Sequence, residues 1–329
     1  MKPMTSLRLW PRYLSGLVLL LILARPPAGA ADSTQSSNYA LFARTNLVAW
    51  CIVPFDASQR GPEARAEMLE RLGFQNFAYD YRSRHIPTFD AEVEALERHH
   101  VGLFAWWFPT TLNDEARLIL GVIRRHHVHP QLWVMGSGGP VRSPGEQAAR
   151  VISEANRIQP ITKAAAEAGC VVALYNHGGW FGEPENQIAI IQELRVRGTT
   201  NIGIVYNQHH GHSQIDRFPA LMRAMKPYLL ALNLNGMVRD GDKHKLEILP
   251  VGQGDVALEL SLQQIVRDSG WRGPVGLLNH TDEDAEARLL DNLEGLAWLD
   301  AQRDGASATP KPQLRTRREA QPGQGPPRK

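Results

Sequence analysis

Asparagine and histidine follow three of the most apolar stretches of the sequence. These stretches cover residues 171–175, 202–206 and 275–278, and each is typical of a strand buried on both faces of a parallel sheet. The polar residues that follow them are Asn176 and His177, Asn207 and His210, and Asn279 and His280. An imidazole titrates near neutral pH, and an amide both donates and accepts hydrogen bonds. The pattern therefore favours proton transfer on, or recognition of, a small polyhydroxylated molecule.

Further polar and aromatic side chains stand at the ends of other predicted strands. We predict that His177, His210 and Asp80 transfer protons, because imidazoles suit that role and Asp80 is the only carboxylate at a predicted strand end. We predict that the remaining strand-end residues contact the ligand, with amides reading hydroxyl groups and aromatic rings covering the apolar face of a sugar. These residues are Trp106, Trp107, Asn176, Asn207, Asn233, Asn235, Gln253, Asn279 and His280.

Several of these side chains also have a purely structural interpretation. His177 would then only hold a loop carbonyl group, and Asp80 would pair with Arg82 or Arg84. The two tryptophans would then pack in the core and at its rim.

Eight strand–helix repeats are predicted to position the strand-end residues. The predicted strands cover residues 47–53, 74–79, 101–108, 131–135, 171–175, 202–207, 229–232 and 275–278. The predicted helices cover residues 62–72, 89–99, 112–127, a segment from 143 onward, 186–197, 215–225, 256–268 and 284–299. Eight such units over residues 45–301 predict an α/β fold, a single (β/α)8 TIM barrel, with the active site at the C-terminal ends of the strands.

A doubly wound sheet with a dinucleotide site is the alternative fold. Its glycine-rich fingerprint would begin at Gly136, and its sixth position requires Gly or Ala. Val141 stands there instead, so the sequence favours the barrel.

The two ends of the chain differ in composition from the predicted barrel. Residues 1–30 have the pattern of a secretory signal peptide: basic residues, an apolar run at 17–24 and small residues at 28–30. Residues 31–44 form a polar linker, and residues 302–329 form a basic Pro/Gln/Arg-rich tail that we predict to be disordered. We therefore predict an exported protein, periplasmic or secreted, without membrane contact after signal cleavage. An uncleaved N-terminal anchor is the alternative.

The charge distribution argues against a nucleic-acid partner. The formal net charge of the chain is +2. Residues 1–30 carry +4 and residues 302–329 carry +5, which leaves −7 for residues 31–301. An acidic body lacks the basic surface that nucleic acids require.

The sequence contains two cysteines, Cys51 and Cys170. Each lies in or beside a predicted strand, the first and the fifth, on opposite sides of a barrel, where their separation would forbid a disulfide. We predict two buried free thiols.

Four passages carry a resemblance to a known family. Residues 175–179 resemble a family run ending in Glu-Asn-His, and residues 207–210 resemble its Asp-x-x-His. Residues 233–235 fall where a His-x-x-Asp pattern is usual, and residues 250–255 resemble a Gly-Glu-Gly signature. The chain thus resembles the xylose isomerase-like TIM barrels, a group of sugar-phosphate isomerases and epimerases, inosose dehydratase-like proteins and metal-dependent AP endonucleases. The resemblance covers nearly all of residues 45–301.

The usual metal ligands of that family are replaced here. In the family, Glu, Asp, His and Glu from the fifth to eighth strands hold a divalent metal. The matching positions of this chain hold Tyr175, Asn207, Asn233 and Leu278 or Asn279. Amides and tyrosine are poor ligands for hard divalent cations, so we expect no metal at these positions and no cofactor that the sequence specifies. A divalent metal on a rebuilt site of His177, His210 and His280 is the alternative.

The resemblance implies a sugar isomerase or epimerase-like protein, and the predicted signal peptide implies that it is exported. It would act on a neutral sugar or keto-sugar by proton transfer at a sugar carbon, or as a lyase or dehydratase on a keto-sugar. The alternative is a non-catalytic carbohydrate-binding barrel that has lost the metal site. A nuclease function is disfavoured by the acidic body and the missing ligands. The predicted partner is a small-molecule carbohydrate.

Overall fold

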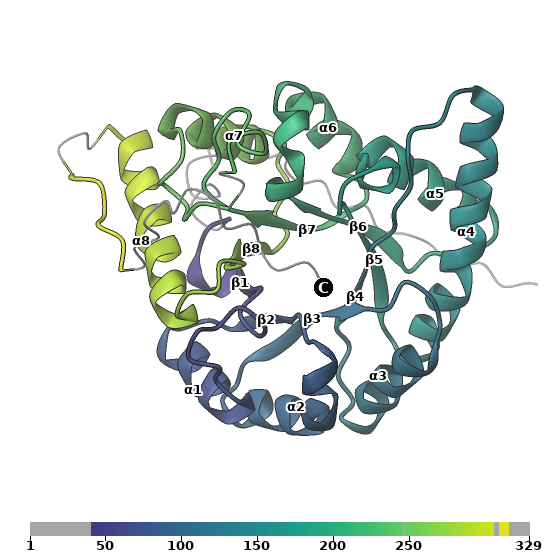
Figure 1. Cartoon of the computed structure of the whole chain (residues 1–329), viewed down its shortest axis with the longest axis horizontal. Coiled ribbons are helices and arrows are strands. Elements are labelled where there is room, and N and C mark those ends of the chain that lie inside the picture. Colours follow the sequence, from purple (N-terminus) through teal and green to yellow (C-terminus); the bar gives the residue numbers. More distant parts are fainter. Residues whose placement is uncertain (1–40, 246–247, 306–308, 316–329) are drawn as a thin grey trace, which may run out of the picture. The chain divides into compact units, whose positions relative to one another are not determined.

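Eight parallel strands form a closed barrel. The computed structural model describes residues 41–245, 248–305 and 309–315. In this part of the chain each strand pairs with the next, and the eighth strand pairs with the first. The strands are β1 (Leu47–Trp50), β2 (Asn76–Tyr79), β3 (Gly102–Phe108), β4 (Gln131–Val134), β5 (Val171–Tyr175), β6 (Ile202–Asn207), β7 (Leu229–Leu234) and β8 (Val275–Leu278). The predicted single (β/α)8 TIM barrel is therefore confirmed, as the inner ring of strands in Figure 1 shows.

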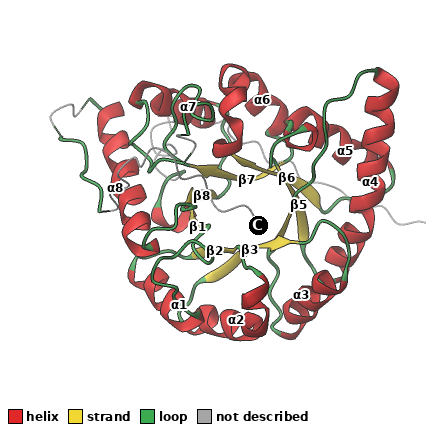
Figure 2. Ribbon diagram, viewed as in Figure 1, coloured by secondary structure: helices red, strands yellow, loops and turns green. Residues whose placement is uncertain are grey.

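Eight α-helices surround the strands (Figure 2). They are α1 (Pro62–Arg71), α2 (Phe89–Arg98), α3 (Asp114–Arg125), α4 (Pro144–Glu167), α5 (Pro184–Val196), α6 (Phe218–Met225), α7 (Val256–Asp268) and α8 (Ala285–Arg303). The predicted start of α4 is confirmed, because the Ser143 side chain caps the helix by accepting from the Glu146 amide. Helix α6 begins three residues later than predicted, since residues Gln208–Arg217 first form a stretch of 3-10 helix.

Side chains alternate between two buried layers along each strand. Those facing the helices form the larger core, which includes Tyr79 and Trp106. Those facing the barrel axis are small at several positions, such as Ala78 and Ala173, and the space between them is filled by Trp133 and other aromatic rings. This alternation decides which strand-end residues face the axis.

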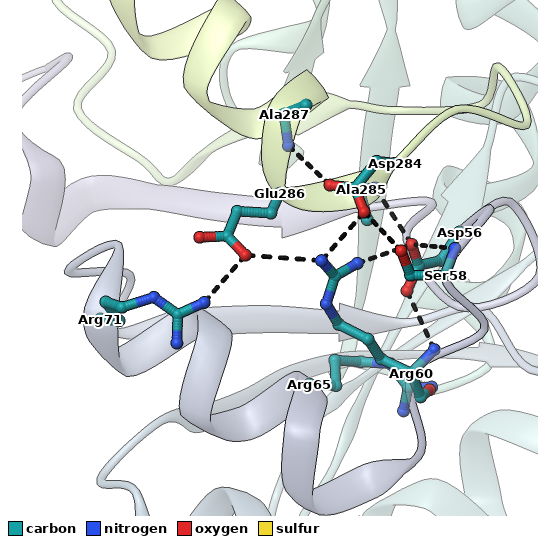
Figure 3. A network of polar contacts seen from close by, with 9 residues as sticks. All are labelled: Asp56, Ser58, Arg60, Arg65, Arg71, Asp284, Ala285, Glu286 and Ala287. Atoms are coloured by element: carbon teal, nitrogen blue, oxygen red, sulfur yellow. Dashed lines mark hydrogen bonds and ion pairs between the residues drawn. The ribbon is translucent and has the colours of Figure 1, made fainter. Parts of the chain in front are cut away.

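A polar network fastens the loop after β1 to the start of α8 (Figure 3). The buried Asp56 carboxylate accepts hydrogen bonds from the backbone amides of Ser58, Arg60 and Ala285, at 3.0–3.1 Å. The Arg60 guanidinium bridges Asp56 and Asp284, at 2.8 and 2.9 Å. The first and last strand–helix units are therefore joined by polar contacts as well as by strand pairing.

The ends of the predicted domains differ in how far the structure describes them. Residues 1–30 and most of the 31–44 linker lie outside the described residues, but Leu41 and Phe42 are buried against the barrel. Helix α8 continues to Arg303, and Arg315 pairs with Glu294 of that helix. Residues 306–308 and 316–329 of the predicted tail lie outside the described part. No helix within the described part is long and apolar enough to span a bilayer.

Candidate functional site

A pocket of about 110 Å³ lies at the C-terminal ends of the strands. Its lining comes from the ends of most of the strands and the loops that follow them. The lining residues are Trp50, Cys51, Phe55, Asp80, Arg82, Trp107, Tyr175, His177, Asn207, His209, His210, Leu278 and His280. Six residues predicted from the sequence are among them: Asp80, Trp107, His177, Asn207, His210 and His280. The pocket is thus rich in imidazole and aromatic groups and contains one carboxyl group.

Asp80 follows β2 and its carboxyl group is almost fully buried. One carboxyl oxygen accepts from the Val53 amide at 3.3 Å, and the other has no hydrogen-bond partner among the described residues. Burial raises the pKa of Asp80 to about 7, although the nearby Arg82 guanidinium opposes this shift. A carboxyl group with this pKa exchanges protons readily near neutral pH.

Asp80 and its arginine neighbours do not form the ion pair considered for them. The Arg82 guanidinium instead donates to the backbone carbonyl oxygens of Asp80 and Tyr81, at 2.9 and 2.8 Å. No carboxylate of the described residues lies within ion-pair distance of Arg82 or Arg84. The Asp80 carboxyl group is therefore not neutralised by a salt bridge.

His177 and His210 lie together on the other side of the pocket. Their ring centroids are 4.5 Å apart, and the His210 ring also lies 5.7 Å from that of Tyr175. Burial and the neighbouring imidazoles lower the pKa of His210 far below its usual value. His210 is therefore a neutral imidazole at physiological pH, suited to donate or accept a hydrogen bond rather than to carry a charge.

Cys51 forms part of the pocket wall beside Asp80. Its backbone has φ of 60°, in the left-handed region that residues with a Cβ atom rarely occupy. Burial and the nearby Asp80 carboxyl raise the pKa of the Cys51 thiol well above its usual range. Strained backbone of this kind concentrates at functional sites. Both Cys51 and Cys170 are buried free cysteines, which confirms the predicted absence of a disulfide.

Two of the positions that match the family's metal ligands, Tyr175 and Asn207, contact each other. The Tyr175 hydroxyl accepts hydrogen bonds from the Asn207 side chain and, at 3.3 Å, from Trp50 Nε1. Asn233 on the next strand contributes an amide that is fully buried. This donor set contains no carboxylate or imidazole, so it does not fit a hard divalent cation.

The rebuilt three-histidine metal site is not supported by the geometry. His177 and His210 are neighbours, but His280 packs on the Phe55 ring, with centroids 3.6 Å apart. Among the residues that the structure describes, no group of three His, Cys, Asp or Glu side chains has the arrangement of a metal site.

Trp106 lies outside the pocket, so its predicted contact with a ligand needs correction. It is fully buried in the layer between strands and helices, where it makes edge contacts with Tyr79 at 5.2 Å and Phe89 at 5.0 Å. Its neighbour Trp107 faces the barrel axis and packs edge-on against Tyr175 at 5.0 Å. The alternation along β3 separates the two rings.

The predicted amides are used mainly to hold the framework. Asn176 joins β5 to β6 by exchanging hydrogen bonds with the Asn207 backbone, at 2.7 and 3.1 Å. Asn279 donates to the Trp50 carbonyl at 3.1 Å, and Asn235 donates to the Gly236 carbonyl at 2.9 Å. With Asn233, these three amides lie outside the pocket lining.

Gln253 also lies away from the pocket. Its side chain donates to the Pro312 carbonyl at 3.1 Å, which ties the loop after β7 to the segment beyond α8. In the same loop, the buried Glu259 carboxylate accepts from the Gly252 and Gly254 amides, both at 2.8 Å. The Gly-Gln-Gly passage therefore stabilises the backbone conformation of the loop after β7.

Seven lining residues are not among the ligand-contacting residues predicted from the sequence. Tyr175 and Leu278 were named only as replaced metal positions. Trp50 and Cys51 lie within the first predicted strand, which carries no polar motif, and Arg82 was considered only as a partner of Asp80. Phe55 lies in the loop after β1, and His209 was quoted only as part of a motif. A search for aromatic residues along the whole of every predicted strand, and not only at its end, would have found Trp50.

No family model matches the chain, and no curated protein sequence matches it. Solved structures match in fold. 3-Keto-D-glucoside 4-epimerase from E. coli, in its apo form, aligns at TM-score 0.52 and 14% identity over 78% of this chain and 99% of its own. D-Allulose 3-epimerase from Methylomonas sp., in complex with D-allulose, aligns at TM-score 0.52 and 14% identity over 79% and 97%. The IOLI protein with a binding zinc atom aligns at TM-score 0.59 and 13% identity over 78% and 99%. This chain therefore shares the (β/α)8 TIM-barrel fold of these solved structures.

Proposed function

We propose that this chain is a sugar isomerase or epimerase-like enzyme that moves a proton at a carbon of a small sugar or keto-sugar. The observation that carries the proposal is the buried Asp80 carboxyl, which lines the pocket and has a pKa of about 7. The fold likeness to sugar epimerases supports the substrate class.

The opposite wall carries groups that can stabilise the charge formed by proton removal. Strands β2 and β6 are four places apart in the ring of eight, so Asp80 faces the end of β6 and its His210 across the pocket. The Tyr175 hydroxyl accepts two hydrogen bonds, which leaves its own proton to donate. A neutral His210 and Tyr175 can therefore both donate to the oxygen of a reacting carbonyl group.

The proposed step needs no metal. The Asp80 carboxylate takes the proton from the carbon next to the carbonyl, and the electron pair of the broken C–H bond moves to give an enediolate. The carbonyl oxygen then carries the negative charge, stabilised by His210 and Tyr175. The proton of the neighbouring hydroxyl group passes to the former carbonyl oxygen, and the Asp80 carboxylic acid delivers its proton to the former carbonyl carbon, which completes isomerisation. His177, beside His210 at the mouth, is the candidate for delivery to the opposite face in an epimerisation.

Exchange of a substrate C–H for deuterium tests this proposal directly. The chain is incubated in D2O with a panel of aldoses and ketoses, and the loss of the C–H signal is followed by NMR. Asp80→Asn should lower the exchange rate by roughly 100-fold or more, because general base catalysis contributes ~10²–10⁴-fold. The His177→Gln, His210→Gln double variant should also lose turnover but retain binding.

A non-catalytic sugar-binding barrel is the second candidate, favoured by the replaced metal positions. Binding without any deuterium exchange across the panel would establish that alternative.

We also propose export through residues 1–30. Intact mass of the protein from the exported fraction, beginning at Ala31, would support it, and a full-length mass would contradict it.

A further inference from the structure

The pocket lining contains one permanently charged cation and one buried carboxyl group. Of the residues that line it, Asp80 is the single acidic side chain and Arg82 the single guanidinium, and four others are histidines. Asp80 lies at the buried wall, next to Cys51 and the Val53 amide. Arg82 is exposed. A permanent positive charge is therefore presented without a nearby exposed carboxylate of the pocket.

Arg82 is held in place by groups that do not neutralise it. Two backbone carbonyl oxygens accept from its Nη1 atom, and the guanidinium carbon lies 5.2 Å from the centre of the Phe55 ring. His280 packs on the same ring at 3.6 Å. Phe55 thus gathers a guanidinium from the loop after β2 and an imidazole from the end of β8, and the network of Figure 3 fixes the loop that carries Phe55.

The amides that would read neutral hydroxyl groups are engaged elsewhere. Asn176, Asn235 and Asn279 donate to backbone carbonyls and do not line the pocket. The one lining amide, Asn207, is bonded to the Tyr175 hydroxyl and to the His209 amide. The basis for expecting a neutral ligand is therefore absent from the pocket.

We propose that the ligand is a sugar acid, with a single carboxylate bound by Arg82 and His280 on the Phe55 ring and its hydroxylated part against Trp107. This inference rests on the proposed function for the position of the reacting carbon, but it concerns binding. A planar guanidinium pairs with a carboxylate in a fork geometry that also fixes its orientation. One permanent cation matches one negative charge. A second, dianionic source of negative charge, a sugar phosphate, is distinguished by the test below.

Binding of matched sugars measures the preference. Isothermal titration of the full chain at pH 7 compares D-glucuronate with D-glucose, D-galacturonate with D-galactose, and D-glucose 6-phosphate with both glucose compounds. We expect each uronate to bind at least tenfold more tightly than its neutral counterpart and more tightly than the phosphate. Equal affinity for uronate and aldose would overturn the proposal, as would tighter binding of the phosphate.

Arg82 variants locate the carboxylate. Arg82→Gln should weaken uronate binding by roughly 10- to 100-fold, because a charge-assisted hydrogen bond is worth ~1.5–3 kcal/mol, and should leave the neutral sugar unaffected. Arg82→Lys, which keeps the positive charge, should lose less uronate affinity than Arg82→Gln. Arg84→Gln is the matched control, since Arg84 is exposed and outside the lining. Equal losses for uronate and aldose in Arg82→Gln would contradict the assignment.

The outcomes separate this inference from the proposed reaction. Uronate binding that depends on Arg82, without deuterium exchange, would keep the sugar-acid site and remove the catalytic proposal. Deuterium exchange on neutral sugars, with no preference for binding uronates, would keep the catalytic proposal and remove the sugar-acid site. Should Arg82→Gln fail to fold, uronate affinity of the unaltered chain at 50 and 300 mM salt replaces it: affinity that does not fall with salt would count against an ion pair at the exposed rim.

Discussion

The carboxyl group of Asp80 shows how burial alone prepares a side chain for proton transfer. None of the described residues forms a salt bridge with it, and its neighbours include the Val53 amide and the Cys51 thiol. Removing a carboxylate from water favours the protonated form, which brings its pKa to about 7. The same burial should make the stability of the protein depend on pH.

The Asp80→Asn variant should gain stability relative to the unaltered chain as pH rises. In the unfolded chain this carboxyl ionises near pH 4, but in the folded chain it ionises near pH 7. Between these values the folded state binds the extra proton, so the unfolding free energy falls with rising pH, by about 4 kcal/mol at most. Urea unfolding at pH 5 and pH 8 measures the effect.

The difference between variant and unaltered protein isolates Asp80 from other groups. Glu259 is also buried with its pKa raised to about 7, but it titrates alike in both proteins. We expect the unfolding free energy of Asp80→Asn minus that of the unaltered chain to increase from pH 5 to pH 8. A difference that stays constant with pH would show that Asp80 is already ionised at pH 5.

Single residues also mark where sequence reasoning succeeds and fails. His177, His210 and Asp80 were found because polar groups after buried strands converge at one end of a barrel. Trp106 and Trp107 were treated alike, although neighbouring strand residues face opposite layers. The asparagines were read by type, but whether an amide faces a ligand or a backbone carbonyl depends on contacts between strands, such as Asn176 with Asn207.

At the scale of elements, the loop after β1 depends on one carboxylate. Asp56 accepts three backbone amides and the Arg60 guanidinium, and its side chain is almost fully buried. Arg60 in turn reaches Asp284, the residue that caps α8 (Figure 3). These contacts join segments distant in sequence, so local patterns gave no sign of them. The strands and helices themselves were predictable from apolar periodicity and caps.

Asp56→Asn should destabilise the polar network that joins the loop after β1 to the start of α8, and it should also weaken ligand binding. The amide nitrogen of Asn would face backbone donors, and the Arg60 charge would lose its buried partner. We expect a loss of roughly 2–4 kcal/mol in unfolding free energy. Urea unfolding measures the stability. Titration with D-glucuronate measures the affinity of the proposed site, to which Phe55 and His280 belong.

The matched control for Asp56→Asn is Arg71→Gln. Arg71 pairs with Glu286 at 2.8 Å within the same network, but its side chain is half exposed. An exposed pair contributes about 0–1 kcal/mol, so this variant should stay close to the unaltered chain. Similar losses in both variants would show that Asp56 has no special role.

At the scale of the whole molecule, the two thiols report on the integrity of the barrel. Cys51 lies after β1 and Cys170 before β5, and both are buried. Burial raises the pKa of Cys170 to about 11 and that of Cys51 well above its usual value, so both remain protonated at neutral pH. Protonated thiols that are largely buried react slowly with disulfide reagents.

Thiol titration should therefore give two different results for folded and unfolded protein. In guanidinium chloride at pH 7.5 we expect two equivalents to react rapidly with a chromogenic disulfide. In the native protein we expect both to react at least 100-fold more slowly, because the thiolate fraction and access are both reduced. One native equivalent that reacts at the unfolded rate would contradict the buried state, and fewer than two in denaturant would indicate a disulfide.

The pairing of β8 with β1 also sets the order in which a growing chain can acquire its ligand site. Phe55 is made early during synthesis, whereas His280, Asp284 and the strand that closes the barrel are made near the end. Until β8 arrives, β1 has an open edge and the loop with Phe55 lacks its partner, a state prone to faulty association. The proposed carboxylate site therefore needs the eighth unit, because His280 of that unit completes it on the Phe55 ring.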